Sequence, residues 1–231
     1  MMKTSFASTS YQQSRSALET YFDKTARKAW EDLTSDAPVS GIRATVRAGR
    51  DAMRALLLST LPADMRGARL LDAGCGTGAL AIEAALRGAE VVAIDVSQGL
   101  VDVARDRAPS GLNIEWRVGD MRSHSLGLFD HVVAMDSLIH YDEHDIVGVL
   151  KAWSQRTAHI AFTFAPGTPL LRLMHVAGKA FPRSDRSPAI KPVSEARLSR
   201  AIVDALPGWR VDSCRRISSG FYKSQAMEIS I

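Results

Sequence analysis

The chain has 231 residues, which is enough for one large α/β domain or for a domain with a small appendage. Hydrophobic residues make up 46% and charged residues 23%, which excludes a mainly disordered chain and a fibrous repeat. The net charge is +4, no run of about 18 uncharged apolar residues occurs, and the N-terminus lacks the apolar core of a secretory signal. Two cysteines, Cys75 and Cys214, are too few for a disulfide framework and indicate a reducing, cytoplasmic location.

The N-terminal segment changes character at Ser14. Residues 1–13 are small and polar without periodicity, and we expect them to be frayed. From Ser14 onward, apolar residues recur at three- and four-residue steps and predict one helical face: Leu18, Phe22, Ala26, Ala29, Trp30 and Leu33. The sequence Ser-Asp-Ala-Pro at 35–38 is expected to end this helix.

A second helix is expected from about Ser40 to Leu58. Its outer face carries arginines that we expect to be mostly solvated: Arg43, Arg47, Arg50 and Arg54. The two helices predict an N-terminal cap over residues 1–60, followed by the main domain over residues 61–231.

After Pro62, short apolar segments alternate with helical ones. Strands are expected at about 69–73, 90–94, 113–118, 129–135 and 159–164, with helices between them. Such alternation predicts a Rossmann-like α/β fold with a mostly parallel sheet and helices on both faces. Two last strands, at about 209–217 and 221–229, are expected to form a terminal antiparallel hairpin and to bring the sheet to seven strands.

Residues 166–192 interrupt this alternation with a short amphipathic run and then a proline-rich basic stretch. We expect an insertion over one end of the sheet, after the fifth strand, that acts as a lid. A helix packed on the sheet edge is the alternative interpretation.

The segment 70–80 carries the most chemical information, because a predicted strand runs into a glycine-rich turn and then a helix. Gly74, Gly76 and Gly78 permit a tight turn, and the helix start offers free N–H groups. Asp72 would repel the pyrophosphate of a dinucleotide, whose usual pattern is G-x-G-x-x-G. The carboxylate suits an ammonium group instead, which favours S-adenosylmethionine as the ligand. Cys75 is expected to fill the loop rather than to act as a nucleophile.

Acidic residues at two further strand ends extend this interpretation. Asp95 can accept both ribose hydroxyls, and Asp120 can accept the adenine amino group while Met121 covers the ring. Either Arg47 or Arg50 is a candidate partner for the cofactor carboxylate. The predicted cofactor-binding set is Asp72, Gly74, Cys75, Gly76, Gly78, Asp95, Val96, Asp120, Met121 and Asp136. Together these features resemble the class I S-adenosylmethionine-dependent methyltransferases.

More specific motifs lie at 21–26, 46–51, 135–141, 181–188 and 220–222. These motifs resemble the magnesium-protoporphyrin IX O-methyltransferase family of bacteriochlorophyll synthesis, and the resemblance covers the chain from about Ser14 onward. It implies methyl transfer to one propionate carboxylate of magnesium protoporphyrin IX, with S-adenosylhomocysteine as product. It also implies contact with the large porphyrin-binding subunit of magnesium chelatase. Peripheral contact of a cytoplasmic enzyme with the photosynthetic membrane stays open.

Carried over to this sequence, the resemblance places the catalytic residues at Tyr21 and His140. Whether His140 orients the acceptor carboxylate or removes a proton from it stays open, and orientation is the preferred role because an ionised carboxylate needs no strong base. The expected substrate-contacting residues are Ile139, Tyr141, Met174, Phe181, Arg183 and Arg186. We expect no protein-bound metal, since His140 and His144 lack an evident third ligand.

Three other functions remain as alternatives at this point. One is a methyltransferase for another small acceptor, such as a quinone precursor. A second is a basic nucleic-acid-binding module, which the pI of about 9.3 permits but the low aromatic content of 6% does not favour. A nicotinamide-dependent enzyme is the third, and Asp72 and the glycine spacing argue against it.

Overall fold

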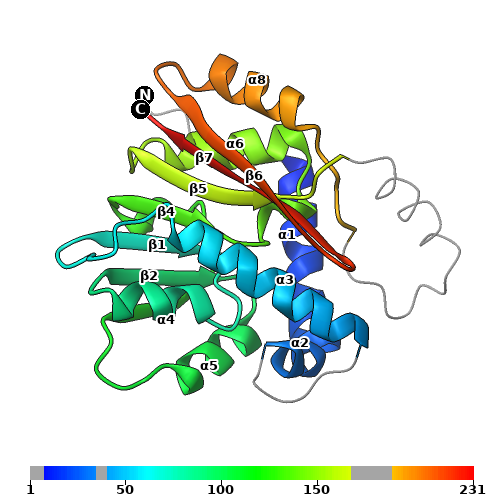
Figure 1. The fold of residues 1–231 in the computed structure, drawn as a ribbon, viewed down its shortest axis with the longest axis vertical. Coiled ribbons are helices and arrows are strands. Elements are labelled where there is room, and N and C mark those ends of the chain that lie inside the picture. Colours follow the sequence, from blue (N-terminus) through cyan, green and yellow to red (C-terminus); the bar gives the residue numbers. More distant parts are fainter. Residues whose placement is uncertain (1–7, 35–40, 168–188) are drawn as a thin grey trace, which may run out of the picture.

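The computed structural model describes residues 8–34, 41–167 and 189–231, with the side chains of all of these except residues 25–29. A seven-stranded sheet has the order β3-β2-β1-β4-β5-β7-β6 (Figure 1). The strands are β1 (Arg69–Ala73), β2 (Glu90–Asp95), β3 (Ile114–Val118), β4 (His131–Ala134), β5 (His159–Phe164), β6 (Arg210–Ser219) and β7 (Tyr222–Ser230). Neighbours among β1 to β5 pair in parallel, and β7 runs antiparallel to both β5 and β6. The predicted mostly parallel sheet with a terminal antiparallel hairpin is therefore confirmed.

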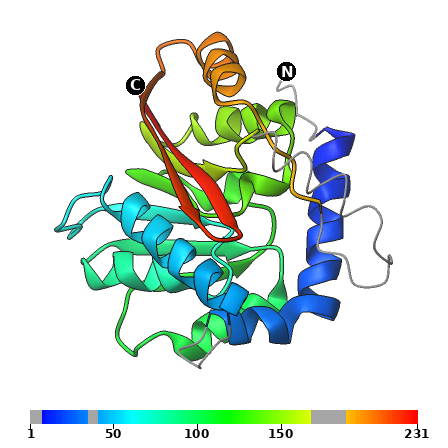
Figure 2. The ribbon, with the colours of Figure 1, turned by 45° about the vertical axis from the view of Figure 1, so that its right-hand side comes forward.

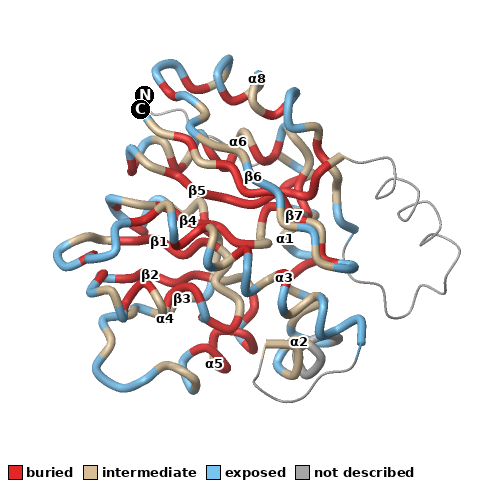
Figure 3. The backbone as a smooth tube through the Cα atoms, viewed as in Figure 1, coloured by how far each residue is buried: buried red, intermediate tan, exposed pale blue. Residues whose placement is uncertain are grey.

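Helices cover both faces of the sheet, as the alternating pattern predicted. On one face, α3 (Gly41–Leu58) and α4 (Ala79–Leu86) bury residues such as Met53, Leu57 and Ala84. On the other face, α6 (Glu143–Trp153) and α8 (Glu195–Ala205) bury residues such as Trp153 and Ile202. Helix α5 (Gln98–Arg107) packs against β2 and β3. Figure 3 shows the buried strands as a continuous layer inside these helices.

Polar side chains cap the starts of two of these helices. The Ser97 hydroxyl accepts the Leu100 N–H at 3.2 Å at the start of α5, and the Asp142 carboxylate accepts the Asp145 N–H at 3.0 Å at the start of α6. Helix α6 follows the short 3-10 helix η3 (Leu138–His140). A second 3-10 turn, η2 (His124–Leu126), precedes β4.

The expectation that residues 1–13 are frayed is wrong for the part that the structure describes. Helix α1 begins at Thr9 and runs to Tyr21, and the Ser8 hydroxyl caps it by accepting the Tyr11 N–H at 3.2 Å. Ser8 and Ser10 also donate to the buried Asp145. These small polar residues therefore hold the start of α1 against α6. From composition alone, such residues are expected to be exposed to solvent.

The single helix expected after Ser14 is also interrupted. The π-helical segment η1 (Phe22–Ala26) separates α1 from α2 (Arg27–Leu33). We call residues 8–34 the arm. Figure 2 shows the arm lying along one side of the molecule, next to the ends of the strands. Such π-helical segments are uncommon and occur frequently at functional sites.

The arm is fastened to the domain at both ends of α5. The Asp23 carboxylate accepts the Ser97 hydroxyl at 2.5 Å and the Gly99 N–H at 3.1 Å at the start of that helix. Arg107, at its other end, donates to the carbonyls of Thr34 and Glu31 at the end of α2. The arm therefore packs against the domain through specific polar contacts.

The predicted insertion at 166–192 lies mostly outside the described residues. Its two ends meet, because Val193 N donates to Ala165 O and Gly167 N donates to Val193 O, both at 2.8 Å. In the described part of the chain, no helix is both long enough and apolar enough to cross a bilayer.

Candidate cofactor and acceptor site

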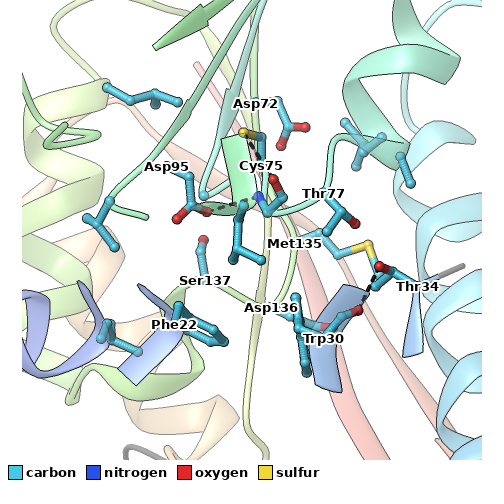
Figure 4. Close-up of a pocket in the computed structure, with 18 of the residues that line it drawn as sticks. Phe22, Trp30, Thr34, Asp72, Cys75, Thr77, Asp95, Met135, Asp136 and Ser137 are labelled. Carbon is cyan, nitrogen blue, oxygen red and sulfur yellow. Dashed lines mark hydrogen bonds between the residues drawn. The ribbon is translucent and has the colours of Figure 1, made fainter. Parts of the chain in front are cut away.

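A pocket of about 350 Å³ lies at the carboxyl ends of β1, β2 and β4. Its floor is the glycine loop after β1, and its other walls come from the arm, from α3 and from the turn after β4. Figure 4 shows side chains from these segments pointing into one space. In doubly wound sheets ligands bind at this edge, where strand order reverses around β1 and β4.

The backbone of the glycine loop needs glycine at Gly74. This residue has φ of 84°, and a Cβ on it would lie 2.3 Å from Ser137 Cβ. The Ser137 hydroxyl donates to Ala73 O at 2.8 Å, so the turn after β4 is held directly against the loop. Gly76 and Gly78 also have positive φ, which agrees with the tight turn predicted from the spacing.

Asp72 lies beneath this loop with 1% exposure, and its Oδ2 atom has no hydrogen-bond partner among the described residues. Burial, together with the nearby charge of Asp95, raises the pKa of Asp72 to about 7. An orphaned buried carboxylate oxygen is costly unless a donor or cation reaches it. The ammonium group of S-adenosylmethionine would supply one, so this residue fits the predicted cofactor.

Asp95, at the end of β2, holds the loop and lines the pocket. Its two oxygens accept the N–H of Gly76 at 2.9 Å and of Ser97 at 3.0 Å. Burial raises its pKa, and each oxygen keeps a lone pair that can accept a ribose hydroxyl. Val96 lines the pocket beside it. Burial raises the pKa of the Cys75 thiol well above its usual range, so this side chain stays protonated, as a loop filler would.

Asp120 does not lie among the described residues that line the pocket, whereas its neighbour Met121 does. The Asp120 Oδ1 atom accepts the Tyr11 hydroxyl at 2.7 Å and the Arg122 N–H at 2.8 Å. Arg15 Nη1 lies 3.5 Å from its Oδ2 atom. The structure therefore connects Asp120 to the arm, a contact that the sequence interpretation missed.

The turn after β4 brings His140 and Tyr141 to the pocket. His140 is 8% exposed at the end of η3, and Tyr141 is buried with its ring stacked on Tyr11 at 5.0 Å. Ile139 does not line the pocket, and its carbonyl accepts the Lys191 N–H at 2.8 Å. Tyr11 was missed because it falls in the part expected to be frayed, although the capping Ser8 three residues earlier is a usable helix signal.

Tyr21 is half-buried at the end of α1, with its ring edge-on to Phe22 at 5.2 Å. Phe22 lines the pocket and Tyr21 does not. Phe22, Trp30 and Leu33 of the arm are pocket residues that helical periodicity identified only as an apolar face, and Thr34 lines the pocket beside them. The remaining predicted substrate-contacting residues lie outside the described residues: Met174, Phe181, Arg183 and Arg186.

The prediction that the α3 arginines are mostly solvated is correct for Arg43 and wrong for the other three. Arg47 donates to the carbonyls of Leu33 and Asp32 at 3.0 and 2.9 Å. Arg54 pairs with Glu83 and with Asp51. Arg50 Nη1 lies 2.6 Å from Asp136 Oδ2, and the guanidinium covers the Trp30 ring at 4.7 Å. The arm contacts Arg47 and Arg50, and α4 contacts Arg54; helical periodicity reveals neither arrangement.

Three side chains that could bind a metal ion also lie close together outside the pocket. Ligand atoms of Asp142, His144 and Asp145 lie within 4.8 Å of one another. Asp142 caps α6 and Asp145 accepts the hydroxyls of Ser8 and Ser10, so hydrogen bonds within the protein explain why the two carboxylates lie there.

Comparison with known proteins agrees with this site. The family model of the magnesium-protoporphyrin IX methyltransferase C-terminus matches residues 134–230, and a methyltransferase domain model matches residues 70–159. The magnesium-protoporphyrin O-methyltransferase of Rhodobacter capsulatus is 48% identical over 222 residues, covering 94% of this chain and 97% of that one. The chloroplastic magnesium protoporphyrin IX methyltransferase of Arabidopsis thaliana is 29% identical, covering 90% and 68%.

A solved structure gives the same result for the fold. The magnesium protoporphyrin IX methyltransferase of Synechocystis PCC 6803 with bound S-adenosylhomocysteine superposes with a TM-score of 0.79 at 25% identity, covering 93% of this chain and 98% of that one. With a glycine loop and Asp95 at one pocket at the strand ends, the chain belongs to the magnesium-protoporphyrin O-methyltransferase family and is a class I S-adenosylmethionine-dependent methyltransferase.

Proposed function

We propose that this chain transfers the methyl group of S-adenosylmethionine to a propionate carboxylate of magnesium protoporphyrin IX. The products are the monomethyl ester and S-adenosylhomocysteine. The observation that carries this proposal is that one pocket holds both the orphaned carboxylate of Asp72, suited to the donor, and His140, suited to the acceptor. The names of the relatives supply the substrate.

S-adenosylmethionine supplies a methyl group activated on a sulfonium. Asp72 binds its ammonium group, and the loop around Gly74 to Gly78 lies along the methionine part. Asp95 accepts the ribose hydroxyls, and Val96 and Met121 flank the adenine. Asp120, which was expected to accept the adenine amino group, already pairs with Tyr11 through Oδ1 and with Arg15 through Oδ2, so its proposed role is to hold the arm beside the adenine site.

The acceptor needs alignment more than it needs a base. A propionate has a pKa near 4, like that of Glu, and is ionised at neutral pH. Transfer consumes a carboxylate and a sulfonium and leaves neutral products, so water stabilises the reactants more than the transition state. The pocket therefore must exclude water and align oxygen, methyl carbon and sulfur. The arm residues Phe22 and Trp30 provide an apolar wall for this purpose.

His140 is proposed to hydrogen-bond the carboxylate and to direct one lone pair at the methyl group. Tyr21 is proposed to assist from the end of α1, next to the pocket residue Phe22. Removal of a proton by His140 from the minority carboxylic acid is the second candidate role. Orientation is favoured because it requires no proton transfer in the main protonation state.

The macrocycle is proposed to lie over the turn after β4, against Ile139 and Tyr141. We further propose that the segment 166–192, of which residues 168–188 lie outside the described part of the chain, serves as a lid, with Met174, Phe181, Arg183 and Arg186 as its candidate contacts. In this arrangement residues 1–60 form a helical cap, and residues 61–231 form the domain that binds the cofactor.

Delivery of a large apolar substrate is proposed to involve the porphyrin-binding subunit of magnesium chelatase and peripheral membrane contact. Ile42 and Phe221, exposed at the start of α3 and at the hairpin tip, are candidate contact points. Co-sedimentation with that subunit, and separately with anionic vesicles, tests each contact. Recovery of the protein in neither pellet would contradict both.

Product analysis tests the proposed reaction. With labelled S-adenosylmethionine and magnesium protoporphyrin IX, mass spectrometry should find one methyl ester per macrocycle. His140→Ala should lower kcat by about 100-fold or more, since lost alignment of this kind costs about that much, while calorimetry still shows S-adenosylhomocysteine binding. His144→Ala, four residues away with an exposed side chain, is the matched control. Normal turnover by His140→Ala would disprove the assigned role.

A further inference from the structure

Asp136 has an unusual backbone conformation in the turn that leads from β4 to His140. It is the non-glycine residue with positive φ (54°) in the described part of the chain, and it lies between the end of β4 and the 3-10 helix that ends at His140. A left-handed conformation is unfavourable for a non-glycine residue, and Asp tolerates it better than most. Such strain persists where the surroundings enforce it.

Contacts from three elements enforce the conformation. Tyr222 of β7 donates its hydroxyl to Asp136 Oδ1 at 2.9 Å, and the Asp136 N–H donates to the Thr163 hydroxyl of β5 at 2.7 Å. Arg50 of α3 donates to Asp136 Oδ2 at 2.6 Å. The carboxylate side chain is only 6% exposed, so these bonds act in a poorly solvated site.

The next residue fixes the direction of the turn. Ser137 donates to Ala73 O, and the close approach of its Cβ to Gly74 leaves no room for a side chain there. Figure 4 shows Asp136 and Ser137 among the side chains that line the pocket. A rotation at Asp136 would thus move the Leu138–His140 turn relative to the donor loop.

The ion pair between Arg50 and Asp136 also affects the charge at the pocket wall. Arg50 is a pocket-lining cation that stacks on Trp30. An unbalanced cation beside the acceptor would stabilise the reactant carboxylate more than the charge-dispersed transition state and would slow the transfer. The Asp136 carboxylate balances that charge.

Tyr222 is held in place by the same helix. A Cβ at Gly49 of α3 would lie 2.5 Å from Tyr222 Cδ1, so the ring packs directly against the helix backbone. The Tyr222 hydroxyl and the Arg50 guanidinium therefore approach Asp136 from the hairpin and from α3, on a shared, tightly packed support.

We propose that Asp136 is a positioning residue for methyl transfer: it aims the turn that bears His140 and, through its ion pair, balances the charge of Arg50 at the pocket wall. This inference rests on the proposed function. It assigns Asp136 a role different from the direct cofactor contact expected from the sequence.

Steady-state kinetics of four variants test the inference. Tyr222→Phe removes one donor and should lower kcat about tenfold, with KM for the porphyrin and Kd for S-adenosylhomocysteine within about threefold of wild type. Asp136→Asn tolerates the left-handed backbone but exposes the Arg50 charge, and should lower both kcat and KM for the porphyrin. The double variant Arg50→Gln/Asp136→Asn should recover part of kcat and restore KM.

Ser213→Ala is the matched control, because it also removes a hydroxyl that donates to a carboxylate, that of Glu228, within the same hairpin. It should leave kcat unchanged. Unaltered kcat in both Tyr222→Phe and Asp136→Asn would overturn the inference, as would a double variant no faster than Asp136→Asn. A parallel loss of S-adenosylhomocysteine affinity would overturn it too, by showing a cofactor contact. Absence of turnover by the wild-type enzyme would instead overturn the proposed function.

Discussion

Asp72 shows how a single buried carboxyl can prepare a pocket for a cation. Its oxygen Oδ2 lacks a partner among the described residues, and its neighbour Asp95 adds a like charge nearby. Both effects favour the protonated form in the protein without cofactor. An ammonium group bound next to Asp72 would stabilise the ionised carboxylate. Cofactor binding and ionisation of Asp72 are therefore coupled.

This coupling predicts pH-dependent cofactor affinity. Since the pKa of Asp72 is about 7 and only the carboxylate pairs with ammonium, a growing fraction of the protein must lose a proton before binding as the pH falls below 7. Kd for S-adenosylhomocysteine should rise between about pH 8 and pH 6, approaching tenfold per unit at the acid end. Calorimetry at three pH values measures this. Asp72→Asn should bind weakly with little pH dependence, and a pH-independent wild-type Kd would count against the pairing.

Gly74 allows a second prediction at the same scale, with a control elsewhere in the chain. Gly67 and Gly74 have similar φ angles, 79° and 84°, but a Cβ at Gly67 meets nothing within 4 Å. Both alanine variants should lose about 1–2 kcal/mol of unfolding free energy from the left-handed backbone. Gly74→Ala should lose more, and its cofactor affinity, because the added carbon collides with Ser137. Denaturant unfolding and calorimetry check this; equal behaviour of the two variants would refute the close approach.

At the scale of elements, the arm is an integral wall of the site. Its contacts reach the starts of α5 and α6 through Asp23 and Ser8, and its end is held by Arg107. Tyr11 makes the most central contact: its ring stacks on Tyr141, and its hydroxyl donates to Asp120. Burial raises the pKa of Tyr11 far above its ordinary value, so the hydroxyl remains a donor.

Removal of that hydroxyl should loosen α1 without removing the ring. In Tyr11→Phe the Asp120 carboxylate loses a charge-assisted hydrogen bond, worth about 1.5–3 kcal/mol. Amide hydrogen exchange in α1 should accelerate by about tenfold or more, and S-adenosylhomocysteine should dissociate faster. Ser16→Ala, on an exposed position of α1, provides the comparison. Unchanged exchange in Tyr11→Phe would show that the arm is held by its other contacts alone.

At the scale of the whole molecule, the buried body of the sheet provides structural support, and the candidate reaction site lies at one end of its strands. The central strands β1, β4 and β5 are buried by helices on both faces, and the pocket lies at the carboxyl ends of β1, β2 and β4. The antiparallel hairpin β6–β7 forms one edge of the sheet, and Tyr222 of β7 contacts the turn after β4. The terminal hairpin thus supports the reacting centre as well as the sheet.

The parts of this architecture that depend on local pattern could be predicted from the sequence. Strand β1 and the tight glycine turn after it depend on neighbouring residues, and they lie where expected. The arm contacts could not be predicted, because Tyr11 and Asp120 are 109 residues apart. Arg50 and Asp136 are 86 apart, and no periodicity of α3 indicates which arginine is covered.

The most direct test of the central claim is a crystal structure of the protein with S-adenosylhomocysteine. The account predicts the ligand's amino group within hydrogen-bonding distance of Asp72 Oδ2, its ribose at Asp95 and its sulfur on the side of the pocket that holds His140. Ligand density at any other place, or Asp72 Oδ2 still without a partner in the complex, would contradict it.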